Sequence, residues 1–170
     1  HMINITGQIL PIKKISEMAH QYGVQVIVDG AHAFAHIQYS IADLGCDYYA
    51  ASLHKWLSVP LGAGILFVKK EHIKNIWPLF GDNEKDPNKI KRINHTGTHP
   101  VHTDLTIPDS IAYYQMIGPA KKEARLRYLQ QYWTSKVKDN SNIILNTPTT
   151  PDRSCAISNV GIKNMKPAIL

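Results

Sequence analysis

Two short apolar runs, each followed by polar residues, constrain the fold more than any other feature of this sequence. The first, Val-Gln-Val-Ile-Val at 24–28, is rich in β-branched residues and does not alternate strictly, which is typical of a strand buried on both faces. Asp29 follows it directly. The second run, at 47–52, also predicts a strand, and His54 and Lys55 come just after it. Parallel pairing of the two strands would bring the acid and the amine to one edge of a sheet.

Helices are predicted around these strands. Apolar residues recur at helical spacing from Ile12 to Tyr22, with Pro11 at the start and Gly23 at the end. The remaining predicted elements are a helical turn at 40–45, strands at 62–70, 142–146 and 154–162, and helices at 71–80, 106–118 and 119–138, the last with a broad apolar face. Alternation of buried strands with helices predicts an α/β fold, in which a mostly parallel sheet is flanked by helices.

The composition is that of a globular domain and argues against several classes of partner. Of 170 residues, 44% are hydrophobic and 19% are charged, which is enough for a domain with its own core. The net charge is +6, but the basic residues are dispersed, so we expect no nucleic-acid partner. The nine histidines form no known metal-binding pattern, so we expect no metal. Short apolar runs and the lack of a signal-peptide pattern predict a cytoplasmic protein without a membrane partner.

An acid and a lysine at one sheet edge suit a particular chemistry. A lysine amine kept from water can lose its proton and attack a carbonyl carbon to form a Schiff base. An aspartate that faces a pyridine nitrogen keeps this nitrogen protonated, because opposite charges stabilise each other's charged forms. Together they describe a pyridoxal 5'-phosphate site, where the protonated ring draws electrons from a substrate carbanion. Each residue alone is weak evidence, since a strand-end aspartate often caps a helix and a lysine mostly lies at the surface.

Three segments, in this order, resemble the core of the fold-type-I, class V aminotransferase family: VDGAHA at 28–33, DYYAASLHKWL at 47–57 and PLGAGILFV at 60–68. That family contains cysteine desulfurases, selenocysteine lyases and isopenicillin N epimerases. The HKWL segment with the glycines that follow is most similar to the epimerase-like branch, and desulfurases tend to carry Gln at the position of His32. The resemblance implies a homodimeric enzyme that uses pyridoxal 5'-phosphate and acts on an amino-acid substrate.

The resemblance also implies roles for single residues. Lys55 would hold the cofactor as a Schiff base and move the proton at the α-carbon of the substrate. Asp29 would pair with the pyridinium nitrogen, and His32 would hydrogen-bond the phenolic oxygen of the ring. Ser52 and His54 would bind the phosphate. As alternatives, Ser52 would only cap a turn, and His32 would be a core histidine bonded to the backbone.

Two further segments resemble parts of the family's site. The segment TGTHP at 96–100 is similar to a loop that reaches the phosphate of the neighbouring subunit, which makes Gly97 and Thr98 candidates for a site shared across a homodimer. The segment NITG at 4–7 is similar to one whose asparagine lies near the substrate, so Asn4 is a substrate-binding candidate. As alternatives, Thr98 would be a loop residue without a ligand, and Asn4 would have no role in the site.

Members of this family are much longer, so the chain is expected to be an internal fragment. Residues 1–146 would be the C-terminal part of the large, cofactor-binding domain, with the helices at 106–138 leading out of it, and residues 147–170 would begin the small C-terminal domain. Cys46 and Cys155 match no desulfurase nucleophile and are expected to be small buried side chains. The reaction stays open between an epimerase- or lyase-like enzyme, a cysteine desulfurase or selenocysteine lyase, a catalytically inert fragment, and an α/β binding module.

Overall fold

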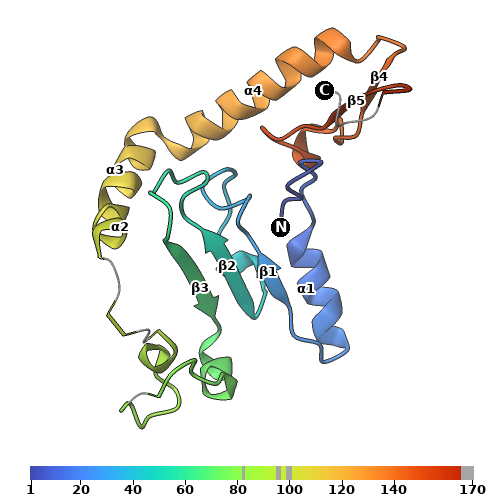
Figure 1. The fold of residues 1–170 in the computed structure, drawn as a ribbon. Coiled ribbons are helices and arrows are strands. Elements are labelled where there is room, and N and C mark those ends of the chain that lie inside the picture. Colours follow the sequence, from blue (N-terminus) through green and yellow to red (C-terminus); the bar gives the residue numbers. More distant parts are fainter. Residues whose placement is uncertain (82, 95–96, 99–100, 166–170) are drawn as a thin grey trace.

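The computed structural model describes residues 1–81, 83–94, 97–98 and 101–165 and contains two small sheets joined by a long helix (Figure 1). Its helices are α1 Ile12–Gln21, α2 His102–Leu105, α3 Ile107–Ile117 and α4 Pro119–Val137. Its strands are β1 Ile27–Asp29, β2 Tyr48–Ser52, β3 Gly64–Val68, β4 Ile143–Leu145 and β5 Val160–Ile162. Short 3₁₀ turns lie at Ala42–Leu44, Lys70–Asn75, Ile90–Ile93 and Pro151–Arg153. The α/β class predicted from the sequence is confirmed.

The first sheet has the order β1-β2-β3 and is mixed rather than mostly parallel. β1 and β2 are parallel, with Asp29 opposite Ala50, but β3 runs antiparallel to β2, with Ser52 opposite Gly64. The reason is the connection at 53–63, which contains no helix. A parallel crossover needs a dozen residues or more and usually a helix, whereas an antiparallel return does not.

The first strand is shorter and less buried than its sequence suggests. β1 starts at Ile27, and this side chain is 73% exposed, whereas Val28 is 3% exposed. The prediction of a strand buried on both faces is therefore wrong for this chain. Val28 packs with Ile12 of α1 in one core. Successive side chains of a strand point to opposite faces, so Ile27 lies on the other face, where it stays exposed.

The two long predicted helices form, but their predicted apolar faces are only partly buried. In α1, Ile12 and Ser16 are buried, whereas Met18 is 58% exposed and Tyr22, after the last helical residue, is 80% exposed. In α4 only Gln130 is buried. α4 extends from α3 beside the first sheet to the β4–β5 hairpin (Figure 1). Its Glu123, Arg127 and Gln130 bond to other segments of the chain, while Tyr128 and Tyr132 stay more than half exposed. These helical faces were predicted from spacing, which does not say whether another element covers them.

The β4–β5 hairpin is attached to the rest of the chain through the segment before β5. The predicted strand at 154–162 forms only at Val160–Ile162, because residues 154–158 run as irregular chain beside α4 and the N-terminal segment. Gln130 of α4 donates to the hydroxyl of Ser154 (3.1 Å), and Arg127 donates to the carbonyl oxygen of the same residue. Cys155 is fully buried at this junction, as expected for a small buried side chain. Cys46 is buried as well.

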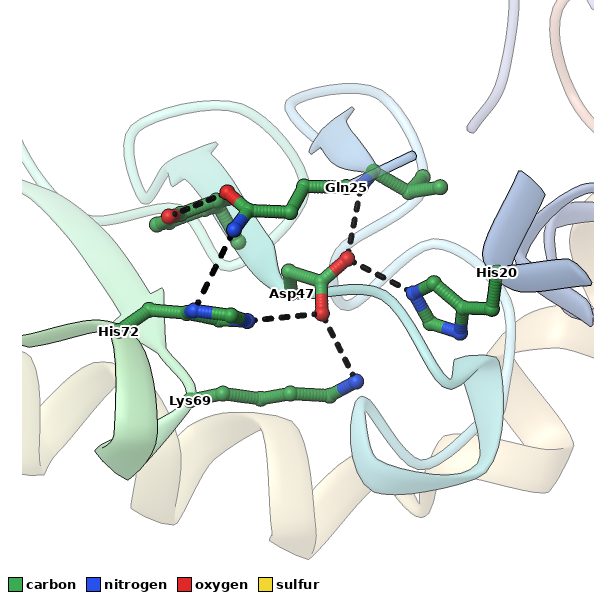
Figure 2. Close-up of polar contacts among 7 residues, drawn as sticks. His20, Gln25, Asp47, Lys69 and His72 are labelled. Atoms are coloured by element: carbon green, nitrogen blue, oxygen red, sulfur yellow. Dashed lines mark hydrogen bonds and ion pairs between the residues drawn. The ribbon is translucent and has the colours of Figure 1, made fainter. Parts of the chain in front are cut away.

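A buried carboxylate, Asp47, fixes one edge of the first sheet (Figure 2). It accepts hydrogen bonds from the following four donors: the ring of His20 (2.8 Å), the backbone of Val26 (2.7 Å), the amine of Lys69 (2.9 Å) and the ring of His72 (3.1 Å). Tyr48 donates to Gln25 (2.9 Å), whose amide nitrogen is 3.5 Å from Nδ1 of His72. Burial opposes ionisation, but the hydrogen bonds to the carboxylate outweigh it and hold the pKa of Asp47 below its usual range.

We expect Asp47→Asn to lower the free energy of unfolding by about 2–4 kcal/mol, because an amide cannot accept from all four donors and leaves the lysine unpaired. Asp43→Asn is the matched control, since Asp43 is exposed in the neighbouring 3₁₀ turn. Because the pKa of Asp47 is lowered by folding, its contribution is fully present above about pH 4 and is lost as the pH falls further. Urea unfolding at several pH values should show that the difference in free energy of unfolding between wild type and variant becomes smaller below pH 4. A difference that does not depend on pH would contradict this account.

Candidate active site

Two predicted site residues end neighbouring parallel strands. Asp29 is the last residue of β1 and Ser52 is the last residue of β2, so both lie at the same edge of the sheet. The carboxylate of Asp29 is exposed and accepts the backbone N–H of Ala31 (2.8 Å), which begins the turn after the strand. Among the described residues, its other oxygen is shown with no hydrogen-bond partner. The sheet edge therefore presents an acid where the carboxyl ends of parallel strands meet.

Lys55 and His32 contact each other directly. Nζ of Lys55 is 3.0 Å from Nε2 of His32, so the lysine amine donates to the lone pair of the imidazole. Burial lowers the pKa of His32, and the positive charge of Lys55 lowers it further, while the charge of Asp29 acts in the opposite direction. His32 is therefore held in its neutral form beside the amine of Lys55.

A cavity of about 370 Å³ opens over this pair, within the size range of small-molecule sites. Its lining residues are Asn4, His32, Lys55, Trp56 and Ile157. Asn4 and Ile157 come from opposite ends of the chain, so the cavity depends on contacts that no local sequence pattern shows. Trp56 stacks on the ring of His36 and also forms part of the cavity wall.

The other predicted residues do not line this cavity. Ser52 ends β2, His54 follows two residues later, and both are half-buried. Nδ1 of His54 is buried without a hydrogen-bond partner in the described part of the chain. Gly97 and Thr98 are described and exposed, but the other residues of the segment 96–100 lie outside the described ranges. Asp29 does not line the cavity either. The roles of all the predicted site residues, including those that line the cavity, stay predictions.

One feature that the sequence analysis missed is a tyrosine pair under the turn. Tyr49 is fully buried, donates to the carbonyl oxygen of Gly30 (3.3 Å) and shares a short hydrogen bond with the hydroxyl of Tyr39. Burial raises the pKa of Tyr49 to about 12, so the hydroxyl stays protonated. A Cβ placed on Gly30 would lie 1.8 Å from the Tyr49 oxygen. The glycine directly after the strand-end acid was the available signal, because this position tolerates no side chain.

Comparison with known proteins shows which family this is. Residues 1–170 match the family described as Aminotransferase class-V. The chain belongs to this family. It is 29% identical over 170 residues to isopenicillin N epimerase of Streptomyces clavuligerus, covering 91% of this chain and 43% of that protein. It is 37% identical over 171 residues to a probable cysteine desulfurase of Xylella fastidiosa (strain Temecula1), covering 93% of this chain and 40% of that protein.

Solved structures of the family have the same fold. A cysteine desulfurase of Thermococcus onnurineus NA1, in its apo form, superposes with a TM-score of 0.84 at 20% identity, covering 99% of this chain and 44% of that one. The cysteine desulfurase CsdA of Escherichia coli superposes with a TM-score of 0.82 at 19% identity, covering 98% and 43%. The chain thus has a fold-type-I architecture and spans less than half the length of these relatives.

Members of this family depend on pyridoxal phosphate, and the residues of this site fit that group. Nδ1 of His32 and Nδ1 of His54 are both buried without a hydrogen-bond partner among the described residues. Buried polar atoms of this kind are normally paired, so each is suited to a polar group of a bound molecule. The amine of Lys55, the free oxygen of Asp29 and the cavity volume are all compatible with a phosphorylated pyridine aldehyde.

We expect Gly30→Ala to disturb the site, because the new methyl group would clash with the hydroxyl of Tyr49 and displace the turn between Asp29 and His32. The variant should lose about 2 kcal/mol or more of stability, as expected for overpacking, and should change the chemical shifts of the His32 ring. Gly81→Ala is the matched control, since a Cβ at Gly81 meets no atom within 4 Å. Urea unfolding and histidine NMR spectra provide the test. Equal stability of both variants would show that the turn yields without cost.

Proposed function

We propose that the full-length protein carrying this chain is a pyridoxal-phosphate enzyme that acts on an amino-acid substrate in an epimerase- or lyase-like reaction. The observation that carries the proposal is the contact of Lys55 with His32 in a cavity that also contains Asn4, beside the strand-end Asp29. When bound, the cofactor supplies an electron sink for the carbanion formed at the substrate α-carbon. The residues of this chain bind it, orient it and move protons around it.

Each residue then has a distinct task. Lys55 would hold the cofactor through its side-chain amine and would take the proton from the substrate α-carbon. Asp29 keeps the pyridine nitrogen protonated. His32, held neutral beside the lysine, hydrogen-bonds the phenolic oxygen. Asn4, near the N-terminus, also lines the cavity, and its amide is suited to a polar group of the substrate.

The remaining predicted residues complete the proposal. Ser52 and His54 bind the phosphate, since both lie at the carboxyl end of β2 and Nδ1 of His54 has no partner among the described residues. Gly97 and Thr98 reach the phosphate of a neighbouring subunit in a homodimer.

The protein is cytoplasmic in this proposal. In the described part of the chain, no helix has the length and apolar character that a membrane span requires. The division into a large domain at 1–146 and a small domain from 147 also remains part of the proposal.

A cysteine desulfurase is the second candidate, because relatives with this name reach 37% identity over almost the whole chain. The two cysteines of this chain do not favour it. Cys46 and Cys155 are both buried, and burial raises the pKa of each thiol, whereas a nucleophilic cysteine needs an accessible thiolate. Full-length protein incubated with L-cysteine should therefore release no sulfide through either thiol. Sulfide release that is lost in Cys46→Ser or Cys155→Ser would favour the desulfurase and contradict the assignment of these thiols.

The cofactor assignment predicts a Schiff base on Lys55. Full-length protein mixed with pyridoxal phosphate should develop an absorbance band near the visible range, and borohydride should trap the cofactor on Lys55. Lys55→Ala should lose both signals, because among the described residues no other lysine lines the cavity. Lys13→Ala, which changes an exposed lysine of α1, is the matched control and should keep them. Trapping on other lysines with equal yield, or a band that survives in Lys55→Ala, would contradict the proposal.

A further inference from the structure

The buried ring of His36 contacts three parts of the cavity wall. His36 lies in the turn after β1, and its exposed fraction is 1%. Its Nδ1 is 2.8 Å from the carbonyl oxygen of His32, and its Nε2 is 3.1 Å from the backbone nitrogen of Ala156. The ring also stacks on the indole of Trp56, with centroids 3.7 Å apart and planes 29° apart. One side chain thus joins three segments that are distant in the sequence.

These partners permit a single form of the ring. A carbonyl oxygen only accepts and a backbone N–H only donates, so Nδ1 of His36 carries the proton and Nε2 offers a lone pair. Burial lowers the pKa of His36 to about 4, opposed by the hydrogen bond to the His32 carbonyl. The charges of Lys122 and Arg127 lower it further, and Glu123 acts in the opposite direction. At physiological pH the ring is neutral and can make both hydrogen bonds at once.

Each contact of His36 reaches a residue that lines the cavity or the chain neighbour of one. The bond to the His32 carbonyl fixes the turn that presents the His32 ring to Lys55. Trp56 is the chain neighbour of Lys55, so the stacked rings limit how far the lysine backbone can move. Ala156 precedes Ile157, which also lines the cavity. No other described side chain is shown in contact with all three of these segments.

We propose that His36 is a positioning residue, whose ring holds His32 against Lys55 and keeps the 156–157 segment on the cavity. Its significance for catalysis rests on the function proposed above, but the arrangement itself needs no cofactor. His36 keeps the side chains of His32 and Lys55 at their contact distance. It does not line the cavity itself.

Two substitutions separate positioning from bulk stability. In His36→Asn the side-chain amide can still donate to the His32 carbonyl but cannot accept from Ala156. In His36→Gln the longer side chain can accept from Ala156, but the His32 carbonyl loses its donor. Because each variant removes one buried hydrogen bond, we expect both to lower the melting temperature of the full-length protein to a similar extent.

The decisive measurement is the pKa of His32 by NMR in cofactor-free, full-length protein. His36→Gln should raise the pKa of His32, because the His32 ring would then move away from Lys55, whose positive charge lowers this pKa, and would become more exposed. The same variant should weaken pyridoxal phosphate binding about tenfold, the factor that corresponds to one lost hydrogen bond. His36→Asn should leave both quantities close to those of the wild type.

The outcomes are distinguishable. Equal changes in both variants, in step with their melting temperatures, would overturn the proposal and make His36 an ordinary core residue. A wild type that binds no pyridoxal phosphate, but whose His32 pKa responds to His36→Gln as stated, would refute the proposed function and support the positioning role. Where a variant does not fold, nitrogen-15 spectra of the wild type decide: a ring protonated at Nδ1 supports the proposal, and one protonated at Nε2 overturns it.

Discussion

The Asp47 carboxylate is the interaction on which the geometry of the first sheet depends. Its hydrogen-bond donors come from the end of α1, the residue before β1, and the residues just after β3 (Figure 2). β2 itself begins at the next residue. One acid thus ties together the start of two parallel strands and the end of the third. Because the strands leave this edge in a fixed register, Asp29 and Ser52 arrive together at the opposite edge. Stability is concentrated at one edge of the sheet and the reactive side chains at the other.

Much of this arrangement could be predicted from the sequence, and for a physical reason. Strand ends, helix starts and the order of elements follow from local patterns such as the β-branched run before Asp29 and the helical spacing after Pro11. Local patterns could not predict the contact of Lys55 with His32, since the two residues are 23 positions apart. Both residues became candidates only through the resemblance of their segments to the family. The antiparallel return of β3 was missed although its signal, a connection without a helix at 53–63, was present.

What could not be predicted concerns which faces are covered. Ile27, Met18 and Tyr128 follow patterns of buried residues, yet each is more than half exposed. The accessible surface is 11401 Å², whereas a compact protein of this mass, 19.1 kDa, has about 8,400 Å². A sequence pattern records that a face is apolar but not what packs on it. Since the chain spans less than half the length of its relatives, we propose that the rest of the longer protein covers these faces.

The choice of imidazole at positions 32 and 36 follows from what the cavity requires. A second positive charge at position 32 would lie against the amine of Lys55, and a charge at the buried position 36 would lose its hydration, so either would oppose folding. A neutral imidazole can instead donate through one nitrogen and accept through the other. His36 uses both nitrogens on the backbone, whereas His32 accepts from Lys55 and keeps Nδ1 without a described partner. The hydrogen bond of His36 to the His32 backbone therefore fixes where Nδ1 of His32 lies. This nitrogen has no partner among the described residues and is suited to a polar group of the proposed cofactor.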